Sequence, residues 1–233
     1  MILAVDSSHL KAVAAILAVG EAGFELRAGL SASTAAAASE SLLPLVDSAL
    51  ERAGMRLGDL KALACGVGPG SFTGIRIGLA TVKALSQVLG LPLLSVSSLR
   101  AVAFSHDPKG QGAALVNAYQ GQVFAGWPGL DGAWQEEALT VEAWHALAEG
   151  RVPQNMSLVG SGVDHYEARL RQLGWGPHMA LGSSLSALGL ARAVDDRIRR
   201  EGATCLQSYL EVQPRYLRPA QATLNLAASL RKG

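Results

Sequence analysis

The sequence has few of the residues that build disulfide-bonded or nucleic-acid-binding proteins. Its 233 residues include only two cysteines, Cys65 and Cys205, which lie far apart. Their number and spacing exclude a disulfide framework and a cysteine-based zinc knuckle, and they favour a reducing compartment. The formal net charge is only +1, whereas proteins that hold nucleic acid by themselves usually carry a large basic excess. We therefore expect that this chain does not bind nucleic acid on its own.

Long apolar runs are absent as well. No segment approaches the roughly 20 consecutive apolar residues that a membrane-spanning helix needs. Residues 1–23 are apolar, but Asp6 and Lys11 interrupt them and no basic segment precedes them, unlike a signal peptide. We expect a cytoplasmic protein without membrane contact. With 49% hydrophobic residues, the chain can bury a substantial core in one large domain or two small ones.

The histidines do not have the spacing of a metal site. A helix that binds metal through histidine usually carries two of them four residues apart. No pair has that spacing among His9, His106, His145, His165 and His178. We therefore predict no metal site and assign the histidines to surface or capping roles.

The order of apolar runs and turns predicts an α/β fold with two related halves. The first half reads β-β-β-α-β-α-β, the order of a ribonuclease-H-like lobe, with helices near residues 39–53 and 72–89. Residues 107–112 predict a boundary, and a β-β-β-α-β order recurs in degenerate form after it. We predict an N-terminal lobe over residues 1–105 and a C-terminal lobe over 106–233, with the last residues able to pack back on the first lobe.

The most specific stretch runs from Gly66 to Val96. A glycine-rich turn follows a predicted strand, Ser71 is suited to cap the next helix, and Gly90 to end it. Such a turn invites a phosphate-binding interpretation, because N–H groups at a helix N-terminus attract anions.

The known nucleotide and nucleophile motifs do not fit this turn. A P-loop needs Gly-Lys-Ser/Thr, but Gly74 is followed by Ile75 and Arg76. The dinucleotide motif needs an acidic residue about 20 positions later, and none occurs between Asp59 and Asp107. A nucleophile elbow needs glycine two residues on either side of the serine, which Ser71 lacks.

The helix after this turn has two apolar faces. One contains Phe72, Ile75, Leu79, Val82 and Leu89, and the other contains Ile77, Ala80, Ala84 and Val88, with Lys83 on the polar strip between them. A helix on a sheet needs one apolar face, so the second must be covered by other parts of the chain or by a partner subunit. For the second case we predict a partner surface that also includes residues of the preceding helix: Leu42, Leu43, Val46, Ala49 and Leu50.

Two polar features remain open to alternative interpretations. Asp6, with Ser7 and Ser8, ends the first strand and is either a turn carboxylate satisfied by these serines or the remnant of a nucleotide site that holds hydrated Mg²⁺. Arg76, Lys83 and Arg100 lie in a segment without acidic residues, which marks either a site for an acidic partner or a basic rim.

The segment GVGPGSFTGIRIGLATVKALSQVLGLPLLSVSSL, together with MILAVDSS, SESLLPLVDSAL and the later PRYLRP, closely resembles the TsaB family of bacterial tRNA threonylcarbamoyladenosine biosynthesis proteins. Its most specific block comprises Gly68, Pro69, Gly70, Ser71, Phe72, Thr73, Gly74 and Arg76. The resemblance covers residues 1–103 strongly and the rest weakly. It implies an actin-like ATPase (ASKHA) fold built of two ribonuclease-H-like lobes.

The resemblance also implies a role. Members of this family resemble non-catalytic scaffolds that position a catalytic paralogue, TsaD, and work with a small ATPase, TsaE, in threonylcarbamoyl transfer to the adenosine beside the anticodon of tRNA. The two helices of the N-terminal lobe would contact TsaD or a second copy of the chain. The family pattern implies no catalytic residue and no cofactor here, with ATP, ADP and Mg²⁺ bound by or with TsaD and TsaE, and tRNA met only through the complex.

The sequence departs from the family pattern at two places. Ala38 stands where many relatives have histidine, and Asn117 where they often have aspartate. The catalytic paralogue uses a His-x-x-x-His pair near its first helix, and no histidine occurs here between His9 and His106. Two rival functions remain: an independent ATP-dependent transferase or kinase with Asp6 orienting the metal, and a glycopeptidase, which the missing metal pair and nucleophile triad disfavour.

Overall fold

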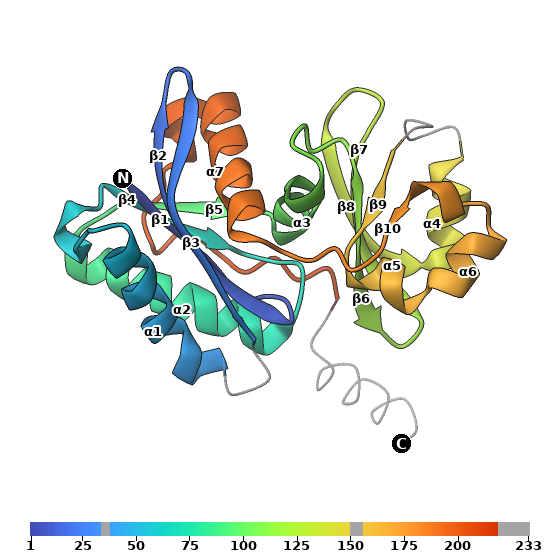
Figure 1. Ribbon diagram of the computed structural model, residues 1–233, viewed down its shortest axis with the longest axis horizontal. Coiled ribbons are helices and arrows are strands. Elements are labelled where there is room, and N and C mark those ends of the chain that lie inside the picture. Colours follow the sequence, from blue (N-terminus) through green and yellow to red (C-terminus); the bar gives the residue numbers. More distant parts are fainter. Residues whose placement is uncertain (34–37, 150–155, 219–233) are drawn as a thin grey trace.

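The computed structural model describes residues 1–33, 38–149 and 156–218, and these form a mixed α/β fold with two five-stranded sheets (Figure 1). Side chains are described for the same residues except 38–41. Within this part of the chain, none of the helices combines the length and hydrophobicity needed to cross a bilayer.

The first sheet has the strand order β3-β2-β1-β4-β5. Strands β1 to β3 form an antiparallel meander, and β4 and β5 continue the sheet in parallel with β1. The predicted order β-β-β-α-β-α-β is therefore confirmed. Its elements are β1 (Ile2–Asp6), β2 (Lys11–Gly20), β3 (Gly23–Ser33), α1 (Ala38–Arg52), the 3-10 helix η1 (Leu57–Asp59), β4 (Ala62–Gly66), α2 (Phe72–Leu89) and β5 (Leu93–Val96).

The second sheet repeats this arrangement. Its order is β8-β7-β6-β9-β10, with an antiparallel meander of β6 to β8 and with β9 and β10 parallel to β6. The two sheets thus share strand order and strand directions. The elements are β6 (Ala113–Tyr119), β7 (Gln122–Pro128), β8 (Trp134–Thr140), α4 (Val141–Ala148), β9 (Leu158–Val159), α5 (Ser161–His165), α6 (Glu167–Gln172), η2 (Gly176–His178) and β10 (Met179–Ala180).

Five layers result, in which helices α3 (Ser98–His106) and α7 (Ala187–Glu201) lie between the two sheets (Figure 1). Helices α1 and α2 cover the outer face of the first sheet, and α4 to α6 cover the outer face of the second. A central apolar cluster joins both sheets, because it includes Ala4 and Leu94 from the first, Val116 from the second, and Leu99 and Leu190 from the helices between them.

The alternation of side chains in the first sheet explains why both of its faces are apolar. In β1, Leu3 and Val5 pack toward α1 and α2, whereas Ala4 packs toward α3 and α7. Successive side chains of a strand point to opposite faces, so a fully apolar strand needs a cover on each side.

Helix α7 supplies that second cover, although it follows the second sheet in sequence. It packs on β1, β2, β3 and β5 and continues into η3 (Gly202–Cys205). Gln207 then pairs with Leu93 at the edge of the first sheet. The strands divide on either side of residue 106, whereas α7 and Gln207, which follow the second sheet in sequence, lie against the first sheet.

Candidate functional site

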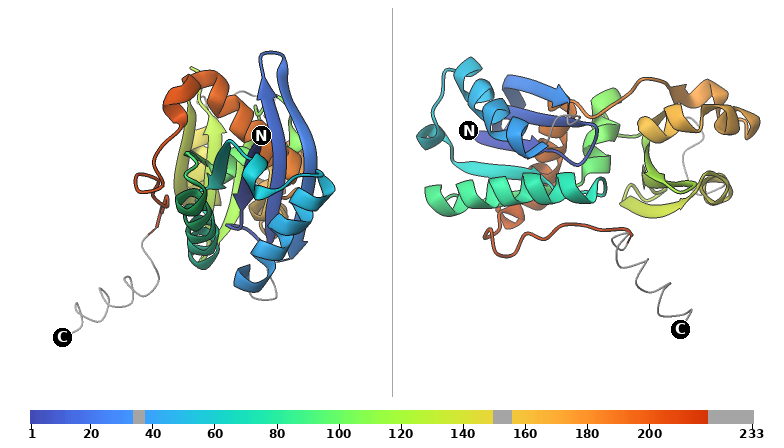
Figure 2. Two further views of the ribbon diagram at one scale, coloured as in Figure 1. Left: turned by 90° about the vertical axis from the view of Figure 1, so that its left-hand side faces the viewer. Right: turned by 90° about the horizontal axis from the view of Figure 1, so that it is seen from below.

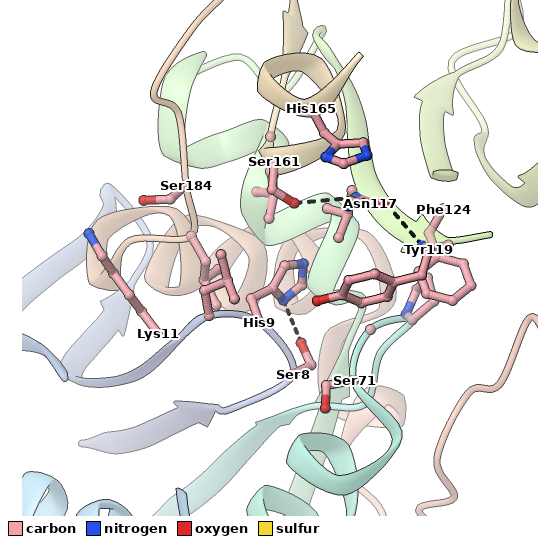
Figure 3. Close-up of a pocket in the computed structure, with 18 of the residues that line it drawn as sticks. Ser8, His9, Lys11, Ser71, Asn117, Tyr119, Phe124, Ser161, His165 and Ser184 are labelled. Carbon is pink, nitrogen blue, oxygen red and sulfur yellow. Dashed lines mark hydrogen bonds between the residues drawn. The ribbon is translucent and has the colours of Figure 1, made fainter. Parts of the chain in front are cut away.

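A cleft of about 940 Å³ opens between the two sheets where their first hairpins face each other. The turn after β1 and the turn after β6 occupy equivalent places in the two sheets, and both line this cleft. Figure 3 shows Ser8, His9 and Ser71 on one wall and Asn117, Ser161 and His165 on the other. The lining is a mixture of hydroxyl, imidazole, amide and aromatic groups.

The glycines of the Gly66–Gly78 segment hold the turn after β1 against the start of α2. A Cβ on Gly66 would overlap the Asp6 carboxylate, one on Gly70 would overlap the Ser8 carbonyl, and one on Gly74 would overlap the Ser7 carbonyl. The Ser8 carbonyl accepts a hydrogen bond from the Ser71 N–H at 2.7 Å. These glycines therefore serve close backbone packing inside the first lobe.

Ser71 caps α2 as predicted, since its side-chain oxygen accepts a hydrogen bond from the Gly74 N–H at 3.3 Å. At the other end, Gly90 adopts the left-handed conformation with φ of 66°. A residue with a Cβ is disfavoured there, which explains why the helix stops at this glycine.

One oxygen of Asp6 has the contacts of a turn carboxylate, but only one of the two neighbouring serines bonds to it. One carboxylate oxygen, Oδ1, accepts hydrogen bonds from the N–H and the hydroxyl of Ser8, at 2.8 and 2.6 Å. The other oxygen packs against Gly66, and the side chain is fully buried and does not line the cleft. The Ser7 hydroxyl does not bond to Asp6 but donates a hydrogen bond to the Gly74 carbonyl at 2.8 Å. The second carboxylate oxygen, Oδ2, is buried and has no hydrogen-bond partner among the described residues.

His9 is a titratable group of the first wall. Its Nδ1 lies 2.6 Å from the Ser8 hydroxyl. Burial lowers the pKa of this imidazole below its usual value, and the negative charge of Asp6 partly opposes the shift. At neutral pH His9 is therefore uncharged in the folded protein.

The second wall is organised by the start of α5. The Ser161 hydroxyl accepts a hydrogen bond from the Asn117 N–H at 3.3 Å, and the Asn117 side-chain oxygen accepts one from the Tyr119 N–H at 2.9 Å (Figure 3). Gly160 and Gly162 pack against the Leu115 carbonyl, which leaves no room for a Cβ. Asn117, one of the two departures from the family pattern, thus shapes the turn after β6. The side chain of the other, Ala38, lies outside the described residues.

A C-terminal strap, residues 215–218, forms the third wall and contacts both lobes. On the first lobe the Arg215 N–H donates to the Val67 carbonyl at 2.8 Å. On the second lobe Arg218 donates to the Ala118 carbonyl at 3.0 Å and to the Gln120 side chain at 2.6 Å. The chain that leads into the strap runs alongside α2 toward the second lobe (Figure 2).

A buried carboxylate of the second sheet anchors the strap. Glu136 on β8 has a fully buried side chain that lies 3.0 Å from the Arg215 guanidinium. It also accepts hydrogen bonds from Trp134 Nε1, at 2.8 Å, and from the Ser97 hydroxyl, at the start of α3. No local motif in the sequence indicates this anchor, because its members are separated by up to 118 positions.

The outer surface of α2 carries the second apolar face. Ile75, Leu79 and Val82 are buried against the sheet, as predicted for the first face. Ala80 and Ala84 are exposed, and Val88 is 83% exposed. Ile77 and Lys83 are half-buried at the margins. No other described element covers this strip of small and apolar side chains.

The contribution of α1 to that surface must be corrected. Leu42, Val46, Ala49 and Leu50 are at most 5% exposed and belong to the core between α1, α2 and the sheet. Their spacing of three or four residues places them on one helix face, which the sheet needs. Of the predicted α1 residues, only Leu43 is on the surface, at 50% exposure.

The three basic residues of the acid-free segment have different environments. Arg100 is internal, with its guanidinium 3.4 Å from Asp196 and stacked 4.7 Å from the Trp134 ring centroid. Lys83 is half-buried on α2. Arg76 is exposed and stacks on Phe72, as described below. The basic-rim interpretation therefore does not apply to Arg100.

In the described part of the chain, no three histidine, cysteine, aspartate or glutamate side chains are grouped closely enough to hold a metal ion. Both cysteines are buried and unpaired. Burial raises the pKa of the Cys65 thiol far above its usual value, and the pKa of Cys205 is raised for the same reason.

A family model described as tRNA N6-adenosine threonylcarbamoyltransferase, TsaD, matches residues 32–231 of the chain. The tRNA threonylcarbamoyladenosine biosynthesis protein TsaB of Escherichia coli is 37% identical over 89 residues, which are 37% of this chain and 38% of that protein. The TsaB protein of Haemophilus influenzae is 40% identical over 65 residues, or 28% of each chain. These matches thus span 38% and 28% of the two relatives' lengths.

Solved structures match over a longer range. A Pseudomonas aeruginosa protein, described as uncharacterized with similarity to the peptidase YEAZ, superposes with a TM-score of 0.72 and 27% identity, covering 93% of this chain and 99% of its own. A second structure, described as YeaZ from the same organism, has a TM-score of 0.69 and 25% identity, with the same coverage.

Proposed function

This chain belongs to the TsaD family and, within it, to the TsaB proteins, and from that premise we propose that it is a non-catalytic subunit of tRNA threonylcarbamoyladenosine biosynthesis. In this proposal the chain binds a catalytic paralogue, TsaD, and positions it for threonylcarbamoyl transfer to tRNA, together with the ATPase TsaE. It adopts an ASKHA-type fold, an idea that the repeated strand order of the two sheets supports.

The observation that carries the proposal is the exposed strip of α2. Ala80 and Ala84 are small, so a helix of another subunit can approach the α2 backbone closely. Val88 extends the strip with a largely exposed apolar side chain, and Leu43 is a further exposed apolar residue on α1. Exposed apolar surface of this kind marks a protein interface more often than a catalytic site.

The cleft supports a structural role more than a catalytic one. Asp6, which the rival ATP-dependent transferase would need for its metal, already accepts two hydrogen bonds from Ser8 and is not among the residues that line the cleft. The glycine-rich turn packs on the turn after β1. The space beside Gly70 and Gly74, where a phosphate could otherwise approach the backbone, therefore holds the carbonyl groups of Ser8 and Ser7. Nucleotide and Mg²⁺ are accordingly assigned to TsaD and TsaE in this proposal.

The proposal is tested by co-purification with TsaD and by a threonylcarbamoyladenosine assay on tRNA. An Ala80→Arg, Ala84→Arg variant should fold normally, because both side chains are exposed, yet lose TsaD binding and modification. Ala146→Arg on α4 is the matched control, since Ala146 is equally exposed but lies on the far lobe. Unchanged binding by the double variant would disprove the interface.

Calorimetry separates this function from the rival one. The isolated chain should bind ATP and Mg²⁺ weakly or not at all. Tight binding that Asp6→Asn abolishes would instead support an independent ATP-dependent transferase. Native mass spectrometry with and without TsaD, TsaE and nucleotide then identifies which assembly forms, including any homodimer.

A further inference from the structure

Arg76 lies at the end of the exposed strip and is held in a fixed orientation by two aromatic side chains. Its Nε donates to the Tyr216 hydroxyl at 3.0 Å. Its guanidinium carbon lies 3.8 Å from the centroid of the Phe72 ring. The rings of Phe72 and Tyr216 are themselves 4.8 Å apart. Two segments separated by 140 positions thus cooperate to hold one exposed side chain.

This arrangement leaves the terminal guanidinium nitrogens of Arg76 available. No hydrogen bond to them is formed by the residues that the structure describes, and none of the described carboxylates lies within ion-pair distance. Because neutral groups already hold the Arg76 side chain in place, it loses less conformational entropy when it binds another group. Its two terminal nitrogens keep the fork geometry that matches a carboxylate.

The position of Arg76 connects it with the docking strip. Residues four apart on a helix are neighbours, so Arg76 adjoins Ala80, which adjoins Ala84. Arg76 does not line the cleft, although Phe72 and Tyr216 do. Helix α2 contains no acidic residue. A carboxylate for Arg76 must therefore come from outside α2, and a group that docks on the strip is in the right place to supply it.

We infer that Arg76 binds a carboxylate of the protein that docks on α2, and that Tyr216 is a positioning residue that orients Arg76 for this contact. This inference rests on the proposed function, and it adds the chemistry by which the partner is recognised: a surface that packs on Ala80 and Ala84 and carries an acidic side chain beside Arg76. It also makes docking depend on the C-terminal strap, which carries Tyr216.

The test is the affinity of the full-length chain for purified TsaD, measured by calorimetry at several salt concentrations. Arg76→Gln should weaken binding about 10- to 100-fold, the usual effect of losing a hydrogen-bonded charge pair, and should flatten the salt dependence. Arg76→Lys should recover the salt dependence but only part of the affinity. Tyr216→Phe should weaken binding about threefold to tenfold and keep the salt dependence, a combination that lost folding would not produce.

Arg171→Gln is the control, because Arg171 is exposed on α6 in the far lobe and its removal changes the net charge equally. If Ala80→Arg abolishes binding while Arg76→Gln leaves affinity and salt dependence unchanged, this inference is wrong and the proposed function stands. If the wild-type chain does not bind TsaD, both are wrong. The inference is also overturned if Arg76→Gln weakens binding to tRNA or self-association instead, since the anion would then be a phosphate or a carboxylate of a second copy.

Discussion

The carbonyl oxygen of Ser7 occupies the space that a Cβ of residue 74 would need. Ser7 lies in the turn after β1 and Gly74 in the first turn of α2, and the Ser7 hydroxyl also donates to the Gly74 carbonyl at 2.8 Å. Gly78, one turn later, is similarly close, since its Cβ would lie 2.6 Å from the Ser7 Oγ. The turn after β1 therefore lies directly against the backbone of α2 at Gly74 and Gly78, in addition to the side-chain packing between the sheet and this helix.

Gly74→Ala should destabilise the protein. Alanine favours a helix over glycine by about 1 kcal/mol, but here the added methyl group meets a backbone carbonyl that cannot move without shifting β1. Overpacking of this kind typically costs about 1–3 kcal/mol, which should exceed the helical gain. Urea unfolding measures the difference. Gly58→Ala is the control, because nothing lies within 4 Å of its Cβ position, and it should leave stability unchanged or slightly raised.

Leu42→Ala and Leu43→Ala should differ widely although the residues are neighbours on α1. Leu42 is fully buried, so its truncation should cost about 2–5 kcal/mol. Leu43 is half exposed, and its truncation should change the free energy of unfolding by about 0.5 kcal/mol or less. Among variants that fold, Leu43→Ala should weaken the binding of TsaD more than Leu42→Ala does. Equal losses of stability would contradict the placement of the α1 core face.

His9 should make the protein less stable in mild acid. Because burial lowers its pKa in the folded state, the unfolded chain binds a proton first as the pH falls below about 6.5. Stability should therefore fall by up to about 1.4 kcal/mol per pH unit from pH 6.5 down to the folded-state pKa. His9→Gln should reduce this slope between pH 6.5 and 5, whereas a His106→Gln control on the exposed end of α3 should retain it. Denaturant midpoints at each pH provide the measurement.

Glu136→Gln should loosen the C-terminal strap. The substitution keeps the shape of a buried side chain but removes the charge that pairs with Arg215 and accepts from Trp134. Trypsin should then cleave the Arg215–Tyr216 bond faster, the tryptophan fluorescence should change, and stability should fall by about 1–3 kcal/mol. Glu137→Gln alters the exposed neighbour on the same strand and should leave the cleavage rate unchanged. Equal cleavage rates in both variants would exclude Glu136 as the anchor.

Local patterns in the sequence predicted most of the first lobe. Apolar runs of strand length, glycine turns and capping serines identify the elements of the first sheet because each depends on residues close together in the chain. The sequence also predicted α1, but residues of its buried face were assigned to a partner surface. Its buried residues follow a three- and four-residue spacing that already indicated a core face, and Pro44 lies in its second turn because the helix begins at Ala38.

The remaining features depend on distant partners and therefore left no local signal. The return of α7 to the first sheet and the contact between Arg76 and Tyr216 join segments on opposite sides of the second lobe. The glycine motif illustrates the same limit. The spacing of its glycines indicated a turn with unusual backbone freedom. Only the structure shows that atoms of the turn after β1 occupy the space that a Cβ at these positions would need.

The return of α7 also has a consequence during synthesis. The first sheet is complete when β5 ends at Val96, yet the helix that covers its inner face begins only at Ala187. At about 5–20 residues per second, the ribosome needs on the order of 10 s to supply that cover. Until α7 is made, the inner face of the first sheet lacks this cover, and we expect the nascent chain to expose apolar surface that favours aggregation. A fragment that stops before α7 should expose the same face of the sheet and aggregate more readily than the full chain.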